Sequence, residues 1–435
     1  MSPATRRRSP LAVALAVVGV VVAVGVAVFV AIAWRSAIAP LDAAPPPGAF
    51  DRAVVRRGAG LAAAGNCIGC HQTLDGAPWA GGVAIRTPFG TVHGSNLSPD
   101  PATGIGRWSE AAFRRALREG VARDGSHLYP AFPYDHYTRL ADADIGALYA
   151  FLMTRDPVLQ ATPANDLVFP LGFRPLLAGW KLLFLREGPL AEHANDRGAY
   201  LADALAHCGG CHTPRNALGA EKRDQALSGG EAEGWYAPSL TTSSPSPLPW
   251  TREAMVAYLT TGLAEGHAIA GGPMQQVVLQ LGQAPREDVE AIADTAIAWM
   301  GPVTDARRTR GERSLARAAA LAASGSAAGA ADDPGHRVYL EACAGCHDRG
   351  REAGSAGALQ LPLAVALHEP TPQSLLRIVR DGIAPLDGTG YRWMPAYDTS
   401  IADADLVALL GYLRRAQADL PPWPDTARSV AASRR

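Results

Sequence analysis

The sequence has few lysines, few cysteines and no excess of charge of either sign. Only two of its 40 basic residues are lysines, Lys181 and Lys222, and the formal net charge is −1 over 435 residues. A nucleic-acid-binding protein normally presents a basic face, so this balance argues against a nucleic-acid partner. No glycine-rich dinucleotide fingerprint follows a predicted strand, which argues against a nucleotide-binding domain.

All six cysteines lie in three copies of one motif, Cys-x-x-Cys-His. This spacing is typical of covalent c-type haem attachment, in which two thiols bond to one porphyrin and the histidine binds its iron. A redox dithiol or half of a zinc site could explain one copy, but not the same histidine offset in all three. The sequence therefore predicts three covalently bound haem c groups. The attachment residues are Cys67, Cys70, Cys208, Cys211, Cys343 and Cys346, and the iron ligands are His71, His212 and His347.

The N-terminal segment is strongly apolar. Three arginines at 6–8 precede an uninterrupted apolar run from Leu11 to Trp34, which Arg35 closes. The run is longer than the ~20 residues that a helix needs to cross a bilayer. Because arginines favour the cytoplasmic side, we expect a single-pass anchor in a bacterial inner membrane, with everything after residue 35 in the periplasm. The alternative is a signal peptide cleaved near Ala37–Ala39.

The rest of the chain repeats in units of about a hundred residues, the usual size of a domain. In each unit a helix leads into the haem motif, a second helix begins at Ser or Thr and ends at Gly, and a third helix closes the unit. The predicted helices are 54–64, 109–120 and 144–152, then 197–206, 251–262 and 288–299, then 335–342, 371–382 and 405–413.

This pattern, without strand-like alternation, predicts an all-α fold: three tandem class I cytochrome c domains behind a transmembrane helix. The expected boundaries are a tail (1–10), the anchor (11–34), a linker (35–52), domain 1 (53–156), a strap (157–190), domain 2 (191–302), a linker (303–333), domain 3 (334–420) and a tail (421–435).

The connecting segments differ in composition. The Ala-, Gly- and Ser-rich stretch 313–333 is typical of a flexible linker and would make the third domain mobile. The strap contains Phe169–Phe173 and Trp180–Phe184, which are too apolar for a free linker. We expect it to pack across domains 1 and 2, and the alternative is a second membrane contact. The tail beyond Leu420 is expected to be disordered.

Two methionines occupy equivalent positions. Met274 and Met394 each lie twelve residues after a helix-ending glycine, Gly262 or Gly382. A methionine that packs in a core is the usual case, but the equal offset favours an iron ligand. Methionine as the second axial ligand raises the potential of a haem. We therefore predict Met274 and Met394 as ligands of the second and third haem.

The first unit departs from this pattern. The same offset from Gly120 falls on Phe132, which cannot bind iron. The first haem therefore has either a histidine as sixth ligand or an open position. His127 and His136 lie on either side of Phe132 in the sequence, and His136 is the preferred ligand. Two histidine ligands would lower the potential of this haem, whereas an open position would permit small ligands or peroxide chemistry.

Other residues near the motifs have ordinary alternatives. Met153 and Met300 end the closing helices of the first two units and are expected to lie in the core. Trp108, Trp250 and Arg107 precede the second helix, where they could contact haem propionates or simply pack.

The chain resembles the membrane-anchored triple-haem cytochrome c subunits of bacterial dehydrogenases over nearly its whole length after residue 50. The matching stretches are Asn96–Asp100, Thr103–Ser109, Leu128–Tyr134, Gly272–Met274 and the three haem motifs. Members that serve quinoprotein alcohol dehydrogenases carry Met at the position of Phe132, so this chain departs from them. The cytochrome subunits of molybdenum hydroxylases for aldehydes, nicotinate or isoquinoline are more similar, since they carry stretches like Phe132–His136 and Pro170–Arg174.

The resemblance implies an electron-transfer subunit rather than a catalyst. It would accept electrons from a dehydrogenase large subunit, with an iron–sulfur subunit if the partner is a molybdenum hydroxylase, and pass them to ubiquinone or a terminal oxidase. The alternatives are the cytochrome subunit of a quinoprotein alcohol dehydrogenase and a haem peroxidase that acts at an open first haem. A ligand sensor is disfavoured because no recognisable signalling domain follows the motifs.

Overall fold

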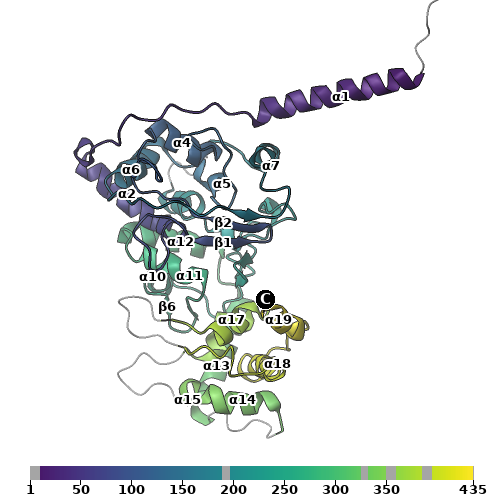
Figure 1. Cartoon of the computed structure of the whole chain (residues 1–435). Coiled ribbons are helices and arrows are strands. Elements are labelled where there is room, and N and C mark those ends of the chain that lie inside the picture. Colours follow the sequence, from purple (N-terminus) through teal and green to yellow (C-terminus); the bar gives the residue numbers. More distant parts are fainter. Residues whose placement is uncertain (1–9, 189–195, 325–331, 349–358, 385–393, 435) are drawn as a thin grey trace, which may run out of the picture.

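The computed structural model describes residues 10–188, 196–324, 332–348, 359–384 and 394–434. Figure 1 shows three groups of helices arranged along the molecule, in sequence order, with helix α1 (Pro10–Ala33) extending away from the first group. We refer to these as the first, second and third groups.

The same helix pair recurs in each group. The first helix of the pair leads into a Cys-x-x-Cys-His motif, and the second lies near the end of the group. The pairs are α2 (Arg52–Ala64) with α6 (Asp142–Met153), α8 (Arg197–Ala199) and its continuation η4 (Tyr200–Leu205) with α12 (Arg286–Trp299), and α14 (Pro334–Ala342) with α18 (Asp403–Tyr412).

A glycine sits at each of these helix crossings. A Cβ atom on Gly58, Gly198 or Gly335 would lie 2.0, 2.3 or 2.2 Å from a backbone carbonyl oxygen of the facing helix. Only glycine permits so close an approach, so the three helix pairs pack in the same way, with a glycine at the point of contact. The second group has one more residue than the first between this glycine and the haem motif. The π-helical turn η4 accommodates the extra residue within the helix.

The second helix of each group ends at the predicted glycine, and the first two of these helices also begin at the predicted N-cap. These helices are α4 (Glu110–Glu119), α10 (Arg252–Thr261) and α17 (Gln373–Asp381). The Ser109 and Thr251 hydroxyls accept the amide protons of residues 112 and 254, which is the expected N-cap. The three helices end at glycines with φ of 60°, 74° and 71°. In α17, Pro372 occupies the capping position and offers no side-chain cap.

The prediction of helical domains is confirmed, but the loops also contain short strands that no alternation pattern indicates. They form the antiparallel sheet β1-β2-β3 and two hairpins. The strands are β1 (Ala84–Thr87), β2 (Gly90–His93), β3 (Asp166–Leu167), β4 (Gly230–Ala232), β5 (Trp235–Ala237), β6 (Leu263–Ala264) and β7 (Ala268–Ile269). Strand β3 belongs to the strap and ties it to the first group.

Further helices complete the described part of the chain. They are η1 (Pro47–Ala49), α3 (Cys67–His71), α5 (Tyr134–Tyr137), η2 (Arg174–Leu176), α7 (Leu177–Phe184), α9 (Gly209–His212), η5 (Arg223–Gln225), α11 (Pro273–Leu281), α13 (Asp305–Ser324), α15 (Ala344–His347), η7 (Leu361–Leu363), α16 (Val365–His368), η8 (Leu413–Gln417) and α19 (Thr426–Ala432).

Among the residues that the structure describes, the buried apolar side chains cluster into two cores rather than three. The first and second groups share one core, in which Leu205 reaches within 3.1 Å of the position of a Cβ on Gly65. The third group has a core of its own around Tyr339, Leu376 and Leu409. The second and third groups meet through hydrogen bonds such as Ser374 Oγ to Tyr236 O, 3.0 Å.

The predicted flexible linker is wrong as far as Ser324, because this stretch forms helix α13. Arg307 donates to the carbonyl of Met300 at 3.0 Å and fixes the start of the helix to the second group. Arg317 donates to the carbonyl of Ala416 at 2.9 Å and fixes its end to the third. Alanine, arginine, leucine and glutamate are strong helix formers, and they outweigh the scattered Gly and Ser. Residues 325–331 of the predicted linker lie outside the described residues.

The predicted disordered tail is also wrong. Trp423 and Val430 are buried in the third core, and α19 covers α18. The Trp423 indole N–H donates to the carbonyl of Glu369 at 2.9 Å, and the Arg414 guanidinium lies 4.1 Å from the centre of the Trp423 ring. The tail is thus an integral part of the third group.

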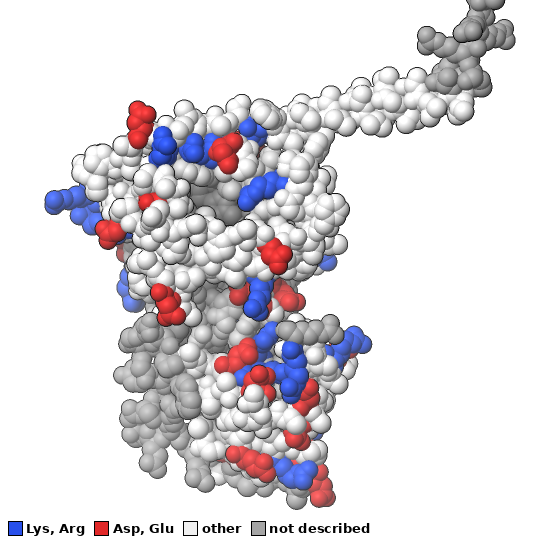
Figure 2. Space-filling view, in the orientation of Figure 1, with Lys and Arg blue, Asp and Glu red and all other residues white. Residues whose placement is uncertain are grey.

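Helix α1 is apolar throughout and its described side chains are mostly exposed. Its segment Ala14–Ala33 is long and apolar enough to cross a membrane, by length and composition. Figure 2 shows the described part of α1 without charged side chains, whereas charges of both signs are scattered over the three groups. The helix is a candidate membrane anchor or signal sequence.

Candidate functional site

Each Cys-x-x-Cys-His motif forms one short helical turn: the first motif is helix α3, and in the second and third the first cysteine caps the start of α9 or α15. Cysteines three positions apart lie on one face of a helical turn, which suits attachment to a single ring. The residues before the first two motifs, Asn66 and His207, have φ of 48° and 42°. This left-handed conformation turns the chain sharply from the preceding helix into the motif.

The histidine of every motif is oriented in the same way. Its Nδ1 lies within hydrogen-bonding distance of a backbone carbonyl oxygen: Ser95 O for His71 at 2.6 Å, Pro238 O for His212 at 2.6 Å, and Leu359 O for His347 at 3.2 Å. A proton on Nδ1 that is donated to this carbonyl leaves the Nε2 lone pair available for iron. Burial lowers the pKa of all three imidazoles, which keeps them neutral. These residues fit the proximal ligands of haem c.

The thiols do not fit the redox-dithiol alternative. All six cysteines are free. Burial raises the pKa of Cys67, Cys208 and Cys343 to about 12, and that of Cys70 to about 11. A dithiol that exchanges with disulfides needs a lowered thiol pKa. The pairs are therefore better suited to permanent covalent attachment than to reversible oxidation.

The first two motifs are neighbours across the shared core. The Tyr137 ring lies 5.4 Å from the Phe132 ring and 5.6 Å from the ring of His207, which directly precedes the second motif. Burial, followed by the charges of Cys67 and Cys70, raises the pKa of Tyr137 well above its ordinary value. Tyr137 thus connects the surroundings of the first motif with the second.

The backbone gives Phe132 and Met274 the same position. In both groups the amide four residues before this position donates to the carbonyl of the helix-ending glycine, Gly120 or Gly262, at 2.7 Å. Met274 packs against the shared core. Met394 packs against the third core, and its backbone pairs with Ile383. The predicted equivalence of Phe132 and Met274 thus has a structural basis, while iron ligation by Met274 and Met394 stays a prediction.

Five residues near the haem motifs could have an ordinary packing role: Met153, Met300, Arg107, Trp108 and Trp250. Met153 and Met300 are almost fully buried, which confirms them as core residues. The side chain of Arg107 donates to Leu41 O at 2.9 Å, and the Trp250 ring stacks on His267 with a centroid distance of 4.0 Å. Propionate contacts of Arg107, Trp108 and Trp250 stay predictions.

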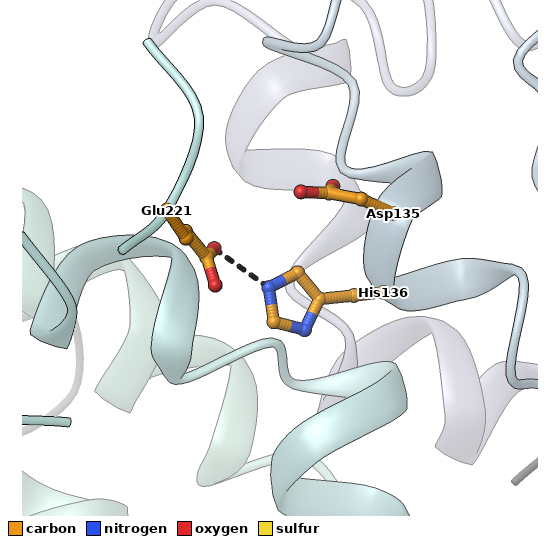
Figure 3. Close-up of side chains that lie close together, drawn as sticks. All are labelled: Asp135, His136 and Glu221. Carbon is orange, nitrogen blue, oxygen red and sulfur yellow. Dashed lines mark hydrogen bonds and ion pairs between the residues drawn. The ribbon is translucent and has the colours of Figure 1, made fainter. Parts of the chain in front are cut away.

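His136 is buried between the first and second groups, and both of its ring nitrogens are engaged. Nδ1 lies 2.7 Å from the carbonyl oxygen of Asp203. Nε2 lies 2.8 Å from Oε1 of Glu221, the contact drawn in Figure 3. Its Cε1 lies 3.2 Å from the position of a Cβ on Gly209, inside the second haem motif. In this arrangement no nitrogen of His136 is free for the first iron. Ligation of that iron by His136 would require the network to break, and it stays a prediction for experiment.

The other candidate histidine is engaged as well. His127 Nε2 lies 2.9 Å from the carbonyl oxygen of Ala33, at the end of α1, and its Nδ1 lies 2.9 Å from Lys181 Nζ. Neither histidine that flanks Phe132 therefore has a free ring nitrogen in this structure.

The surroundings of His136 form an ion-pair network. Burial alone would lower the pKa of His136, but the hydrogen bond and charge of Glu221 raise it above its ordinary value. The same contact lowers the pKa of Glu221 despite burial, whereas burial raises the pKa of Asp135. Arg139 pairs with Asp203. The group lines a cavity of about 270 Å³ beside the second motif.

Asp135, His136 and Glu221 lie within 4.8 Å of one another, the spacing of a metal site. Arg215, 3.9 Å from Glu221, already supplies a positive charge to this cluster. We therefore interpret the cluster as ion pairs between two groups. Sequence reasoning missed Glu221 and Asp203, because they lie 85 and 67 residues from His136 and no local motif marks them.

Two family models match parts of the chain. The model of cytochrome c matches residues 55–156, and that of subunit III of cbb3-type cytochrome c oxidase matches residues 330–413. These segments correspond to the first and third groups and contain their haem motifs.

Several relatives cover most of the chain. One of the subunits of nicotinate dehydrogenase from Pseudomonas putida is 42% identical over 93% of this chain, but the chain spans only 34% of that protein. The gluconate 2-dehydrogenase cytochrome c subunit of Pantoea cypripedii is 34% identical over 88% of this chain and 90% of its own length. The alcohol dehydrogenase (quinone) cytochrome c subunit of Gluconacetobacter polyoxogenes is 32% identical over 88% and 85%.

The matches to the two cytochrome c subunits cover 90% and 85% of those proteins. One family model describes cytochrome c, and the other describes subunit III of a cbb3-type cytochrome c oxidase. The Cys-x-x-Cys-His helices with their oriented histidines supply the covalent haem sites that such subunits need. The chain belongs to the cytochrome c subunits of dehydrogenases, the electron-transfer subunits of these complexes.

Proposed function

We propose that this chain carries electrons from a periplasmic dehydrogenase to the respiratory chain through three covalently bound haem c groups, one in each group of helices. One observation carries the proposal: in all three groups the histidine after the cysteine pair is held by a backbone carbonyl through Nδ1. The three glycine crossings support three equivalent domains, with boundaries near 53–156, 191–302 and 334–420. Each haem supplies a one-electron carrier when bound.

The protein's part is to hold each haem and to set its potential. Cys67 and Cys70, Cys208 and Cys211, and Cys343 and Cys346 attach the rings, while His71, His212 and His347 bind the irons. Met274 and Met394 are the sixth ligands of the second and third haem and raise their potentials.

The first haem differs because Phe132 occupies the methionine position. His136 remains the candidate sixth ligand by sequence, but its engagement with Asp203 and Glu221 supports a different role, that of joining the first and second groups. The first haem then has an open sixth position. The absorption spectrum of the ferric protein distinguishes the two arrangements, since an open haem is high-spin and a bis-histidine haem is low-spin.

A molybdenum hydroxylase that acts on an aldehyde or an N-heteroaromatic compound is the proposed partner, together with its iron–sulfur subunit. The supporting observation is the 42% identity to a protein of nicotinate dehydrogenase. The runner-up is a quinoprotein alcohol dehydrogenase, whose cytochrome subunit is 32% identical. Ubiquinone or a terminal oxidase is the proposed acceptor. Helix α1 anchors the chain in the bacterial inner membrane, with the three groups in the periplasm.

Purification of the tagged chain from its native membranes tests this proposal. Copurifying subunits with molybdenum and iron–sulfur clusters would support the first partner, and a subunit with pyrroloquinoline quinone would support the second. Isolation of the chain as a stable enzyme that turns over substrate alone would contradict both. Peroxide turnover by the chain alone, with an artificial electron donor, would favour a haem peroxidase acting at the first haem.

A further inference from the structure

Helix α7 of the strap has its apolar side outward. Its inward side chains include Ala178 and Lys181, both buried, whereas Leu182 and Leu183 are 71% and 68% exposed. Lys181 Nζ donates to Gly120 O at 2.6 Å, which fixes this orientation. A helix on a water-exposed surface normally has the opposite arrangement. The outer side of α7 is therefore built to be covered by something apolar.

The segment that precedes α7 continues this exposed apolar surface. Phe169 is 97% exposed and Phe173 is 57% exposed. Backbone hydrogen bonds of 2.8 and 2.9 Å, from Leu171 and Phe173, hold the segment in tight turns. We call the exposed apolar side chains of the segment and helix the strap patch: Val168, Phe169, Phe173, Leu176, Leu182 and Leu183. Clustered exposed apolar side chains of this kind mark an interaction surface.

The charges of this stretch are all turned away from the patch. Residues 168–185 contain no acidic residue and only two basic ones, Arg174 and Lys181. Arg174 donates to His127 O at 2.8 Å, and Lys181 Nζ lies 2.9 Å from Nδ1 of the same histidine. Both cations are thus engaged against the first group, which leaves an uncharged outer surface.

The strap patch lies at the root of α1. The Nε2 of His127 lies 2.9 Å from Ala33 O, the last residue of α1, so one histidine connects the end of α1 with η2 and α7. Helices α1 and α7 contact each other, and Figure 1 shows α7 beside the end of α1. Trp34 follows directly and is 71% exposed. Tryptophan is enriched where membrane spans leave the bilayer.

We propose that the strap patch is a second membrane contact, which rests in the headgroup region of the bilayer that α1 crosses. The proposal rests on the proposed function, in which α1 is a retained anchor. The 24 residues of α1 span about 36 Å at 1.5 Å per residue, enough to cross a hydrocarbon core of about 30 Å. The end of α1, Trp34 and the patch then reach the same interface. This position holds the first group at the membrane surface, in addition to the single covalent tether.

Site-directed spin labelling of the full-length holoprotein in phosphatidylcholine–phosphatidylglycerol nanodiscs, without other subunits, tests the proposal. The native cysteines are consumed by haem, so an introduced cysteine is the only free thiol. The labelled variants are Leu183→Cys and Phe169→Cys, and the matched control is Leu340→Cys on α14, an exposed leucine of the third group. The expected result is a several-fold higher ratio of oxygen to nickel-chelate accessibility at 183 and 169 than at 340.

Equal ratios at all three positions in protein that retains α1 would overturn the membrane contact. Shielding that appears only after the dehydrogenase subunits are added would assign the patch to the partner and would also overturn it. The intact mass of the reconstituted protein shows whether α1 is retained. If α1 has been removed, the anchor part of the proposed function fails. In such protein, lipid shielding at position 183 still supports the membrane contact of the strap patch. A lack of shielding at position 183 overturns this contact.

Discussion

The His136–Glu221 pair offers the sharpest perturbation of the contact between the first two groups. In the variant His136→Ala, both hydrogen bonds disappear and Glu221 remains in a mostly buried position with 17% of its side chain exposed. Loss of one partner from a buried ion pair typically costs about 3–5 kcal/mol. Because Arg215 lies 3.9 Å from Glu221 and retains part of the compensation, we expect a somewhat smaller loss, about 2–3 kcal/mol.

Guanidinium unfolding followed by haem absorbance measures this loss. The shared core should unfold at a lower denaturant concentration, while the third core should be unaffected, because the two cores are separate. The matched control is His336→Ala, which removes an equally buried histidine from the third group and should destabilise only that group. Destabilisation of both cores by His136→Ala would refute the two-core description.

The same variant separates the two roles of His136. If the histidine joins the groups, the ferric spectrum of the first haem is unchanged in His136→Ala. If the histidine is the sixth ligand, a high-spin signal that the wild type lacks appears. A new high-spin signal without loss of stability would therefore show that His136 binds the first iron and does not join the two groups.

The stability that this pair contributes also depends on pH in a defined direction. The raised pKa of His136 means that its contribution is fully present below about 6.5 and is lost as pH rises through the raised value. The lowered pKa of Glu221 means that its contribution is present above about 4.3 and is lost as pH falls through the lowered value. The contribution of this pair to the stability of the shared core should thus be largest in mildly acidic solution. The variant Glu221→Gln should abolish the decline on the alkaline side.

Further expectations concern the ligands, the helix crossings and a buried lysine. Met274→Ala and Met394→Ala should each lower the potential of one haem and leave the others unchanged, which a spectroelectrochemical titration would show. Gly335→Ala should destabilise the third core by about 1–3 kcal/mol through overpacking, since its Cβ would lie 2.2 Å from a carbonyl oxygen, and denaturation of the shared core should not change. Burial lowers the pKa of Lys181 to about 7. Above that pH the unfolded chain binds more protons than the folded chain, so the contribution of Lys181 to the free energy of unfolding should rise from about pH 7 to 10. In pH-dependent unfolding curves, Lys181→Met should lack this rise.

Local chemistry explains which parts of the fold are predictable from the sequence. The second helices begin at Ser109 and Thr251 and end at left-handed glycines, because capping depends on neighbouring residues. The haem motifs and the equivalent positions of Phe132 and Met274 can also be predicted from the sequence, since each follows a fixed spacing.

The differences between expectation and structure have physical causes too. The composition of helix α13 resembles that of a linker because alanine is common in linkers and is also the strongest helix former. The tail is ordered because Trp423 reaches Glu369, 54 residues away. The partners of His136 lie at similar distances along the chain, and no period or motif encodes such contacts. Strands of two to four residues are too short to show alternation.

Anaerobic reduction of the purified complex by the substrate of its dehydrogenase, followed at the α-band of the c-type haem, tests electron transfer through this chain most directly. If the chain carries electrons as proposed, the complex contains three haems per chain, and substrate reduces them in the absence of any added mediator. Fewer than three haems per chain, or haems that dithionite reduces and substrate does not, would contradict the proposal.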